Sequence, residues 1–186
     1  MEDIRFFFEE YSFVVSVIST MLSLFVGAFL TNHFFKIRAK NSLTFDFHSE
    51  FSSNEFSKYR RQANLFIKKN PTSSYKELGK KDENDSIALF TIMRFYQRLW
   101  IAIKYKKVKK KMAQELFEEN FLYWYFASFK PNLIDSTDWE IRNDIDDFYK
   151  WISTRIDKDK FNRFKNRVLD ASKTEENNQN DSEQRL

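Results

Sequence analysis

The chain has 186 residues, a formal net charge of +4, no cysteine, and only two glycines and two prolines. Turns between strands rely on glycine and proline whereas helices avoid both, so the composition argues against a sheet-rich fold and predicts an all-α protein. The small net charge argues against a dedicated nucleic-acid binder, which concentrates basic residues on one face.

The apolar segment, Tyr11–Phe35, contains 25 consecutive residues without a formal charge. As a helix rising 1.5 Å per residue it would be about 37 Å long, and the hydrocarbon core of a bilayer is about 30 Å thick. Its hydroxyl side chains can bond to carbonyls of their own helix, so no polar group need lack a partner in lipid. We therefore predict a transmembrane helix here, with a buried helix of a soluble protein as the alternative.

The charges on either side of the apolar segment predict its orientation. Before it stand one arginine and four acids (Glu2, Asp3, Arg5, Glu9 and Glu10), and after it stand Lys36, Arg38 and Lys40. A cleaved signal peptide begins with basic residues, so an uncleaved anchor is the better interpretation. Because basic residues stay on the cytoplasmic side, we predict a single-pass protein of the bacterial inner membrane with its N-terminus outside.

This orientation divides the chain into four predicted parts. Residues 1–10 form a short extracytoplasmic stub and 11–35 the transmembrane helix. Residues 36–172 form a cytoplasmic domain that is long enough for one hydrophobic core and is expected to be a bundle of about four helices. Residues 173–186 lack apolar side chains until Leu186 and are predicted to be a disordered tail.

Small side chains recur along one face of the apolar segment, at Ser19, Ser23, Gly27 and Thr31. The four-residue spacing places them on one ridge of a helix, and such ridges allow two helices to approach closely in lipid. Self-association of the span into an oligomer through this face is one hypothesis. The ordinary abundance of small residues in membrane helices is the other.

The first helix of the domain is predicted from its caps and its apolar stripe. The membrane helix is expected to continue past the apolar segment and to break near residues 41–44. Ser52 and Glu55 form a capping-box pattern at the start of the next helix, and Asn70-Pro71 ends it. Its apolar stripe at helical spacing comprises Phe56, Tyr59, Ala63, Phe66 and Ile67.

The strongest helix of the domain is predicted over about Asp85 to Lys106. Its apolar face is broad enough to contact neighbours on more than one side, as in the central helix of a bundle. That face comprises Ile87, Leu89, Phe90, Ile92, Met93, Phe95, Tyr96, Leu99, Trp100 and Ile103. Arg94, Gln97 and Arg98 interrupt it, and any buried guanidinium needs either internal acids or a bound anion or partner.

Six lysines fall within eight residues at the end of this helix: Lys104, Lys106, Lys107, Lys109, Lys110 and Lys111. One interpretation is a surface that contacts anionic lipid headgroups, and another is contact with nucleic acid. The structural alternative is a solvated connection between two helices.

Two further helices complete the predicted domain. One spans about Lys110 to Phe129 and is expected to end at Pro131. It contains FLYWYF at residues 121–126, in which five of six residues are aromatic, so core packing or a subunit interface is expected and a ligand pocket is the alternative. The last helix has the apolar stripe Ile141, Ile145, Phe148, Ile152 and Ile156.

Motifs for catalysis or cofactor binding are not found in the sequence, and no cofactor is predicted. With no cysteine and only His33 and His48, no metal-ligand spacing is present, and the isolated Gly27 and Gly79 provide no phosphate-binding loop. Acids between residues 135 and 147 are candidates for acid–base chemistry or cation binding, with a solvated helix face as the alternative. They are Asp135, Asp138, Glu140, Asp144, Asp146 and Asp147.

Four stretches carry a resemblance to a known class of proteins: RRQANLFIKKNP at residues 60–71, MRFYQRLWIAIKYKKV at 93–108, FLYWYF at 121–126 and DWE at 138–140. Over roughly residues 53–152 the chain resembles uncharacterised bacterial membrane proteins with one N-terminal span and a small cytosolic helical domain. That class has no assigned activity, so the resemblance implies the architecture alone.

Three functions are compatible with these features. The first is a membrane-anchored interaction or assembly protein, without catalytic activity, whose helical domain binds a protein partner or itself. The second is a membrane-perturbing effector of a bacterial anti-phage or toxin-type system. The third is a membrane-tethered enzyme that uses the acids or the two arginines.

Overall fold

A computed structural model describes residues 2–70, 73–81, 83–135 and 139–168, with side chains from Tyr11 onward except that of Glu83. The structure is 87% helix, and its described residues contain no strand, which confirms the prediction of an all-α protein. The predicted tail, 173–186, and Asp138 lie outside the described residues.

The first helix, α1 (Glu2–Ser52), is uninterrupted over 51 residues, so the predicted break near residues 41–44 is wrong. From Ala28 to Ser52 the chain contains neither glycine nor proline, so nothing in the backbone requires a break. Thr44 and Phe51 are buried, so tertiary packing also holds this part of the chain in a helix. The chain divides after Ser42 into two compact units, and we call the second, from Leu43 onward, the helical domain.

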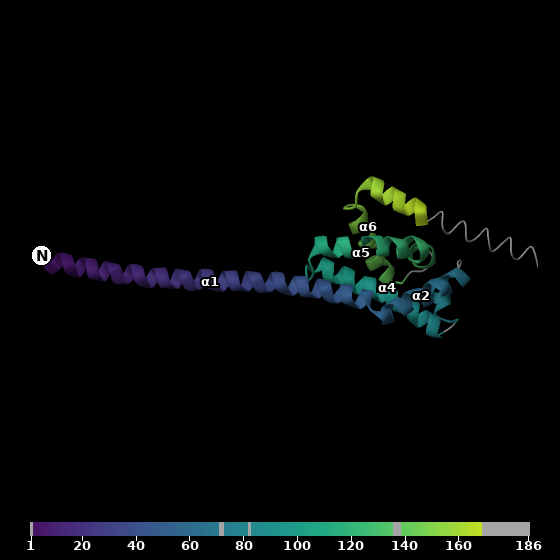
Figure 1. Cartoon of the computed structure of the whole chain (residues 1–186), viewed down its shortest axis with the longest axis horizontal. Helices are drawn as coiled ribbons and strands as arrows, with labels where there is room; N and C mark the ends of the chain where they lie inside the picture. The colour runs from purple at the N-terminus through teal and green to yellow at the C-terminus, as the bar shows by residue number, and fades with distance from the viewer. Residues whose placement is uncertain (1, 71–72, 82, 136–138, 169–186) are drawn as a thin grey trace, which may run out of the picture. The chain divides into compact units, whose positions relative to one another are not determined.

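The described residues of the helical domain form seven further helical segments, and Figure 1 labels the longer ones. In chain order they are α2 (Asn54–Lys69), α3 (Tyr75–Leu78), α4 (Glu83–Lys104), α5 (Lys110–Trp124), the π-helix η1 (Tyr125–Ile134), α6 (Ile141–Ser153) and a final helix of which residues 158–168 are described.

Helix α4 lies at the centre of the domain, since it packs against α2, α6 and α5. Its predicted broad face is confirmed except at Ile87, which is 48% exposed. The ring of Phe95 is fully buried and lies within 6 Å of five other aromatic rings: Phe47, Phe51, Phe56, Tyr96 and Phe117. These aromatic pairs join the end of α1 to α2, α4 and α5 in one core.

Helix α2 matches its predicted stripe, with Phe56, Ala63, Phe66 and Ile67 buried. Its N-cap is one residue later than predicted, because the hydroxyl of Ser53, not Ser52, accepts the N–H of Phe56 at 3.1 Å. Two adjacent serines offer the same capping chemistry, and only the backbone conformation selects one of them.

The aromatic run at residues 121–126 spans the end of α5 and the start of η1 and is buried except for the partly buried Tyr123, which confirms its prediction as core. Phe121, Leu122, Trp124 and Tyr125 are each at most 3% exposed. Pro131 does not end this segment as predicted, because it lies inside η1, which continues to Ile134. A proline clashes with the carbonyl four residues earlier in an α-helix, and the wider π-helical turn relieves that clash.

Helix α6 buries Ile145, Phe148 and Ile152 as its stripe predicts. The indole of Trp100 stacks on the ring of Phe148 at 5.7 Å and lies 6.2 Å from the indole of Trp151. Helices α4 and α6 are therefore joined largely by aromatic contacts.

Candidate functional site

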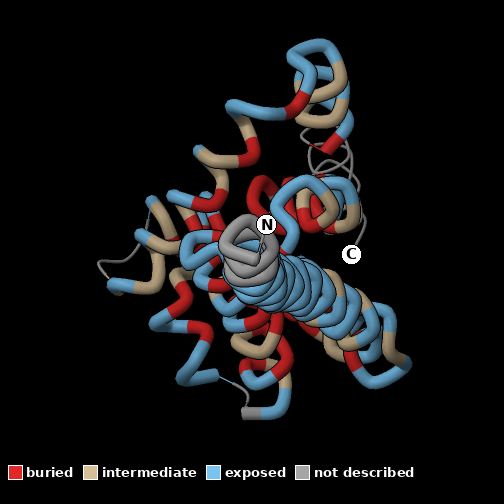
Figure 2. The backbone as a smooth tube through the Cα atoms, turned by 90° about the vertical axis from the view of Figure 1, so that its left-hand side faces the viewer, coloured by how far each residue is buried: buried red, intermediate tan, exposed pale blue. Residues whose placement is uncertain are grey.

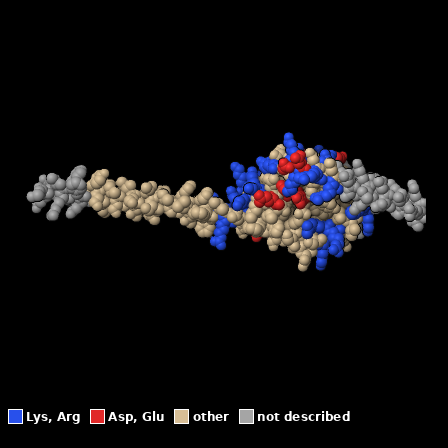
Figure 3. All heavy atoms as spheres, turned by 45° about the horizontal axis from the view of Figure 1, so that its top comes forward, with Lys and Arg blue, Asp and Glu red and all other residues tan. Residues whose placement is uncertain are grey.

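The apolar segment is exposed along its whole length. Every residue from Tyr11 to Phe35 is exposed, and fifteen of its large apolar side chains are among the exposed hydrophobics of the structure. Figure 2 shows this part of α1 in pale blue, and Figure 3 shows it without a basic or acidic side chain. It is therefore one helix near the N-terminus that is long and apolar enough to cross a membrane, a property that signal sequences and core helices of soluble proteins share.

Two hydroxyls of the apolar segment are bonded within their own helix, as predicted. Thr20 donates to the carbonyl of Ser16 and Ser23 donates to that of Ser19, each at 2.8 Å. These bonds give partners to two hydroxyl donors that would be unfavourable in lipid if they were left without any. Close approach of a second helix along the small-residue ridge stays a prediction; a Cβ on Gly27 would meet no atom within 4 Å.

The six lysines lie at the connection between α4 and α5, and we call them the lysine surface: Lys104, Lys106, Lys107, Lys109, Lys110 and Lys111. Helix α4 ends in a Schellman motif, in which Lys107 N–H donates to the carbonyl of Ala102 at 2.8 Å and Lys106 N–H to that of Ile103 at 3.1 Å. Lys106 has a φ of +57°, a conformation in which glycine is the usual residue.

A hydrogen bond and a buried side chain hold the backbone of the lysine surface on the helical domain. The backbone N–H of Lys109 donates to Oγ1 of Thr44 at 3.0 Å, and Thr44 is fully buried. Val108, between the lysines, is also buried. The backbone of the connection is thus held in place while all six lysine side chains are exposed.

The lysine surface has little acidic compensation. Lys111 pairs with Glu115 at a long 3.9 Å. Within the described part of the chain, no carboxylate lies within 4.0 Å of the other five ammonium groups. Residues 101–114 contain no acid, so this stretch of the chain carries only positive charge.

The structure brings Arg94, Gln97 and Arg98 to one shallow groove of about 740 Å³, which Thr91, Glu140 and Ile141 also line. Arg98 pairs with Glu50, and Gln97 donates to the Asp144 carboxylate at 2.8 Å. Arg94 is exposed. The polar groups of α4 therefore connect it to α1 and α6 by structural pairs, and water solvates the remaining guanidinium.

Most of the described acids of the 135–147 cluster also bond to neighbouring side chains, and Glu140 is exposed. Asp146 pairs with Lys150 at 2.7 Å and accepts the hydroxyl of Tyr125 at 3.1 Å, and Asp135 pairs with Lys130 at 3.1 Å. Burial raises the pKa of Tyr125, and the nearby Asp146 raises it further. Among the described residues, no three histidines, cysteines or acids are placed to hold a metal ion.

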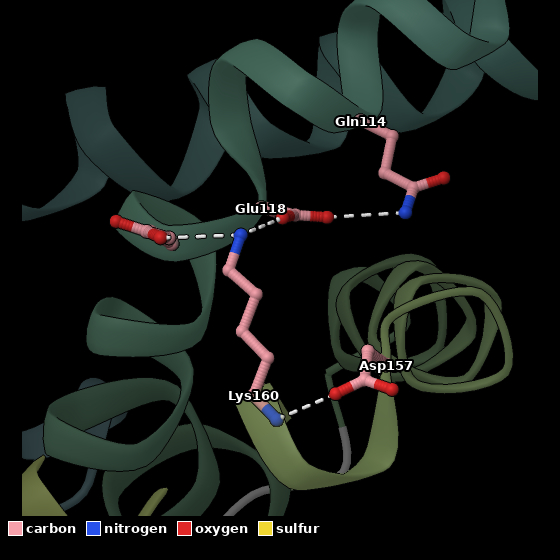
Figure 4. Close-up of polar contacts among 5 residues, drawn as sticks. Gln114, Glu118, Asp157 and Lys160 are labelled. Atoms are coloured by element: carbon pink, nitrogen blue, oxygen red, sulfur yellow. Dashed lines mark hydrogen bonds and ion pairs between the residues drawn. The ribbon is translucent and has the colours of Figure 1, made fainter. Parts of the chain in front are cut away.

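A buried acid that was not predicted from the sequence holds the final helix, residues 158–168, against α5 (Figure 4). Glu118 has a side chain only 9% exposed, and it accepts Lys160 Nζ at 2.6 Å and Gln114 Nε2 at 3.0 Å. Asp157 caps the last helix by accepting the backbone N–H of Lys160 at 2.9 Å. The hydrogen bond with Glu118 raises the pKa of the Lys160 ammonium.

Two other contacts were also not predicted from the sequence. Thr44 and Lys109 are 65 residues apart, and Glu50 and Arg98 are 48 residues apart. No local pattern signals such pairs. Of these contacts, only the cap formed by Asp157 could have been predicted, because an aspartate before a helical stripe is a common N-cap.

The chain was compared with protein-family models, curated proteins and solved structures. No family model, curated protein or solved structure matches it. The resemblance to bacterial single-span proteins stays a prediction.

Proposed function

We propose that the chain is a single-pass protein of the bacterial inner membrane. Its apolar segment anchors a cytoplasmic helical bundle, and this bundle binds a protein partner or a second copy of itself without catalysing a reaction. The N-terminus lies outside the cytoplasm.

The exposure of the apolar segment carries the proposal. Fifteen large apolar side chains are exposed on it. Burying each one is worth about 1.5–3 kcal/mol, so leaving all fifteen in water is unfavourable by on the order of 20–45 kcal/mol. A lipid bilayer removes that cost at once, and it matches the length of the segment.

The completeness of the helical domain supports the same conclusion. Its core residues, among them Phe95, Phe117 and Phe148, are buried against one another from Leu43 onward. The domain therefore does not need the apolar segment to cover its own apolar surface. The acids and arginines that are candidates for chemistry mostly form structural pairs, which favours an interaction role.

Membrane extraction of the full chain tests the anchor. After expression in bacteria, we expect the chain in the membrane fraction, resistant to alkaline carbonate, at its uncleaved mass of 22.6 kDa. A shorter, soluble product would indicate a cleaved signal sequence, and a full-length soluble product would indicate a soluble protein. Either result would overturn the proposal.

The orientation is tested with single cysteines, because the chain has none of its own. We expect Asn162→Cys to react with a membrane-impermeant maleimide only after the cells are permeabilised, and Asp3→Cys to react in intact cells. The reverse pattern would contradict the proposed orientation.

The binding role is tested by photo-crosslinking in membranes. Leu65 on α2 and Ile87 on α4 are 54% and 48% exposed, and these two helices pack together. A photoreactive residue at either position should give one discrete product, at twice the chain mass for self-association. The same probe at the exposed Lys158 is the control. If only the uncrosslinked chain were recovered with the probe at every position, the proposed role would be contradicted.

A further inference from the structure

The lysine surface combines a fixed backbone with exposed positive charge. Its connection is held by the Schellman motif at Lys106 and by the bond from Lys109 to Thr44. The ammonium groups themselves are exposed, and five of them have no acidic partner among the described residues. Such a surface is suited to a ligand with many dispersed negative charges rather than to one small anion.

An exposed aromatic side chain lies within the same surface. Tyr105, between Lys104 and Lys106, is 66% exposed. A tyrosine has an apolar ring and a polar hydroxyl, and such residues are enriched at the headgroup level of membranes. Lysines beside an exposed tyrosine are therefore typical of a surface that meets lipid headgroups.

The chain itself limits how far this surface can be from the end of the apolar segment. Thr44, which binds Lys109, follows Phe35 by nine residues. Nine residues span at most about 30 Å even when fully extended. In an anchored chain, the backbone that carries the lysine surface is therefore tethered within about 30 Å of the end of the apolar segment.

We propose that the lysine surface binds anionic phospholipid headgroups and so docks the helical domain on the inner leaflet. This inference rests on the proposed membrane anchor. Each lysine near an anionic surface increases the docked-to-free ratio by about fivefold. Nucleic acid is the competing ligand, but the anchor, the tyrosine and the low net charge of the chain favour lipid.

The test uses the full chain in nanodiscs, with an environment-sensitive dye on Ile101→Cys. Ile101 is exposed on α4, one turn before Lys104, and its replacement changes no charge. We expect a blue shift of the dye in nanodiscs that contain phosphatidylglycerol, none in phosphatidylcholine alone, and reversal at high salt because the interaction is screened.

Two variants with equal loss of charge make the test specific. Changing Lys104, Lys106, Lys107 and Lys110 to glutamine should lower the docked-to-free ratio at least about tenfold. The same change at four exposed lysines elsewhere in the domain (Lys58, Lys69, Lys76 and Lys80) should leave it within about twofold.

The outcomes separate the docking surface from the anchor. A chain that stays in the nanodisc but shows no dependence on phosphatidylglycerol overturns the docking and leaves the anchor intact. A chain that does not enter the nanodisc overturns the anchor. A dye shift produced in phosphatidylcholine nanodiscs by added double-stranded DNA or transfer RNA would assign the surface to nucleic acid and overturn the lipid proposal.

Discussion

The apolar segment and the core of the helical domain contain the same kinds of residue but differ completely in exposure. Phe25 and Phe29 in the segment are 77% and 71% exposed, whereas Phe95 and Phe117 in the domain are fully buried. The phenylalanines of the domain find other rings within the chain. In the segment, Phe29 and Phe34 meet only the exposed imidazole of His33, so the segment stays uncovered by the chain itself. Hydrophobicity alone does not distinguish the two cases.

The largest expected effect comes from placing charge in the apolar segment. An arginine near the middle of a membrane helix costs about 3 kcal/mol of insertion free energy, so Leu22→Arg with Val26→Arg should cost about 6 kcal/mol. We expect most of this variant to be lost from the carbonate-resistant membrane fraction. Leu22→Ala with Val26→Ala is the control, and equal retention of both variants would remove the distinction between segment and core.

A matched pair of phenylalanine truncations tests the difference between buried and exposed rings through the stability of the helical domain. Phe95→Ala removes a fully buried ring and should lower the unfolding free energy of the helical domain by about 3–5 kcal/mol. Phe25→Ala is the same chemical change at an exposed position and should alter it by less than about 0.5 kcal/mol. Urea unfolding in detergent micelles measures both, and equal effects would contradict the division of the chain into two units.

A smaller effect is expected where the last helix meets α5. Lys160→Met leaves the buried Glu118 without its ammonium partner, which should cost about 1–2 kcal/mol, reduced by solvent because Lys160 is 44% exposed. The exposed Lys158→Met is the matched control. Hydrogen exchange in residues 158–168 should be faster in the first variant, and equal exchange in the two would show that the pair does not hold the helix.

The same pair predicts a dependence on pH. Because the pKa of Lys160 is raised in the folded state, its contribution is complete below the ordinary lysine pKa and is lost as the pH rises through the higher folded value. In the wild type, exchange in residues 158–168 should therefore accelerate at strongly alkaline pH beyond the intrinsic increase. Lys160→Met should lack this additional acceleration.

The smallest effect is a stabilisation. Lys106 occupies the left-handed region at a helix end, where glycine is unstrained, so Lys106→Gly should stabilise the helical domain by about 1 kcal/mol. The thermal midpoint measures this change. Lys107→Gly, one residue later and without the positive φ, is the control and should not stabilise.

Periodicity predicted most of the helices because the residues that decide them are close in sequence. The stripe of α2 and that of α6, from Ile145 to Ile152, are buried as their spacing indicates. The errors lie where distant residues decide. The chain near Thr44 stays helical because packing in the domain buries it, and no local signal near residues 41–44 reveals that packing.

Sites were less predictable than helices for the same reason. The lysines were visible as a run, but their fixed position depends on the bond to Thr44, 65 residues away. Pro131 was expected to end a helix, because local rules describe α-helices and do not anticipate a π-helical turn that accommodates proline. Ile87 belongs to the apolar stripe by spacing, yet it lies on the uncovered side of α4.

The distribution of the indole side chains has a consequence for spectroscopy. All four tryptophans belong to the helical domain, and the apolar segment contains none. The tryptophan emission of the full chain therefore comes from the domain even when the segment is in a bilayer. The ring centroids of Trp100 and Trp151 are only 6.2 Å apart, so the two chromophores are close enough to couple. The near-ultraviolet circular dichroism spectrum is therefore a label-free signal of whether α4 and α6 remain packed.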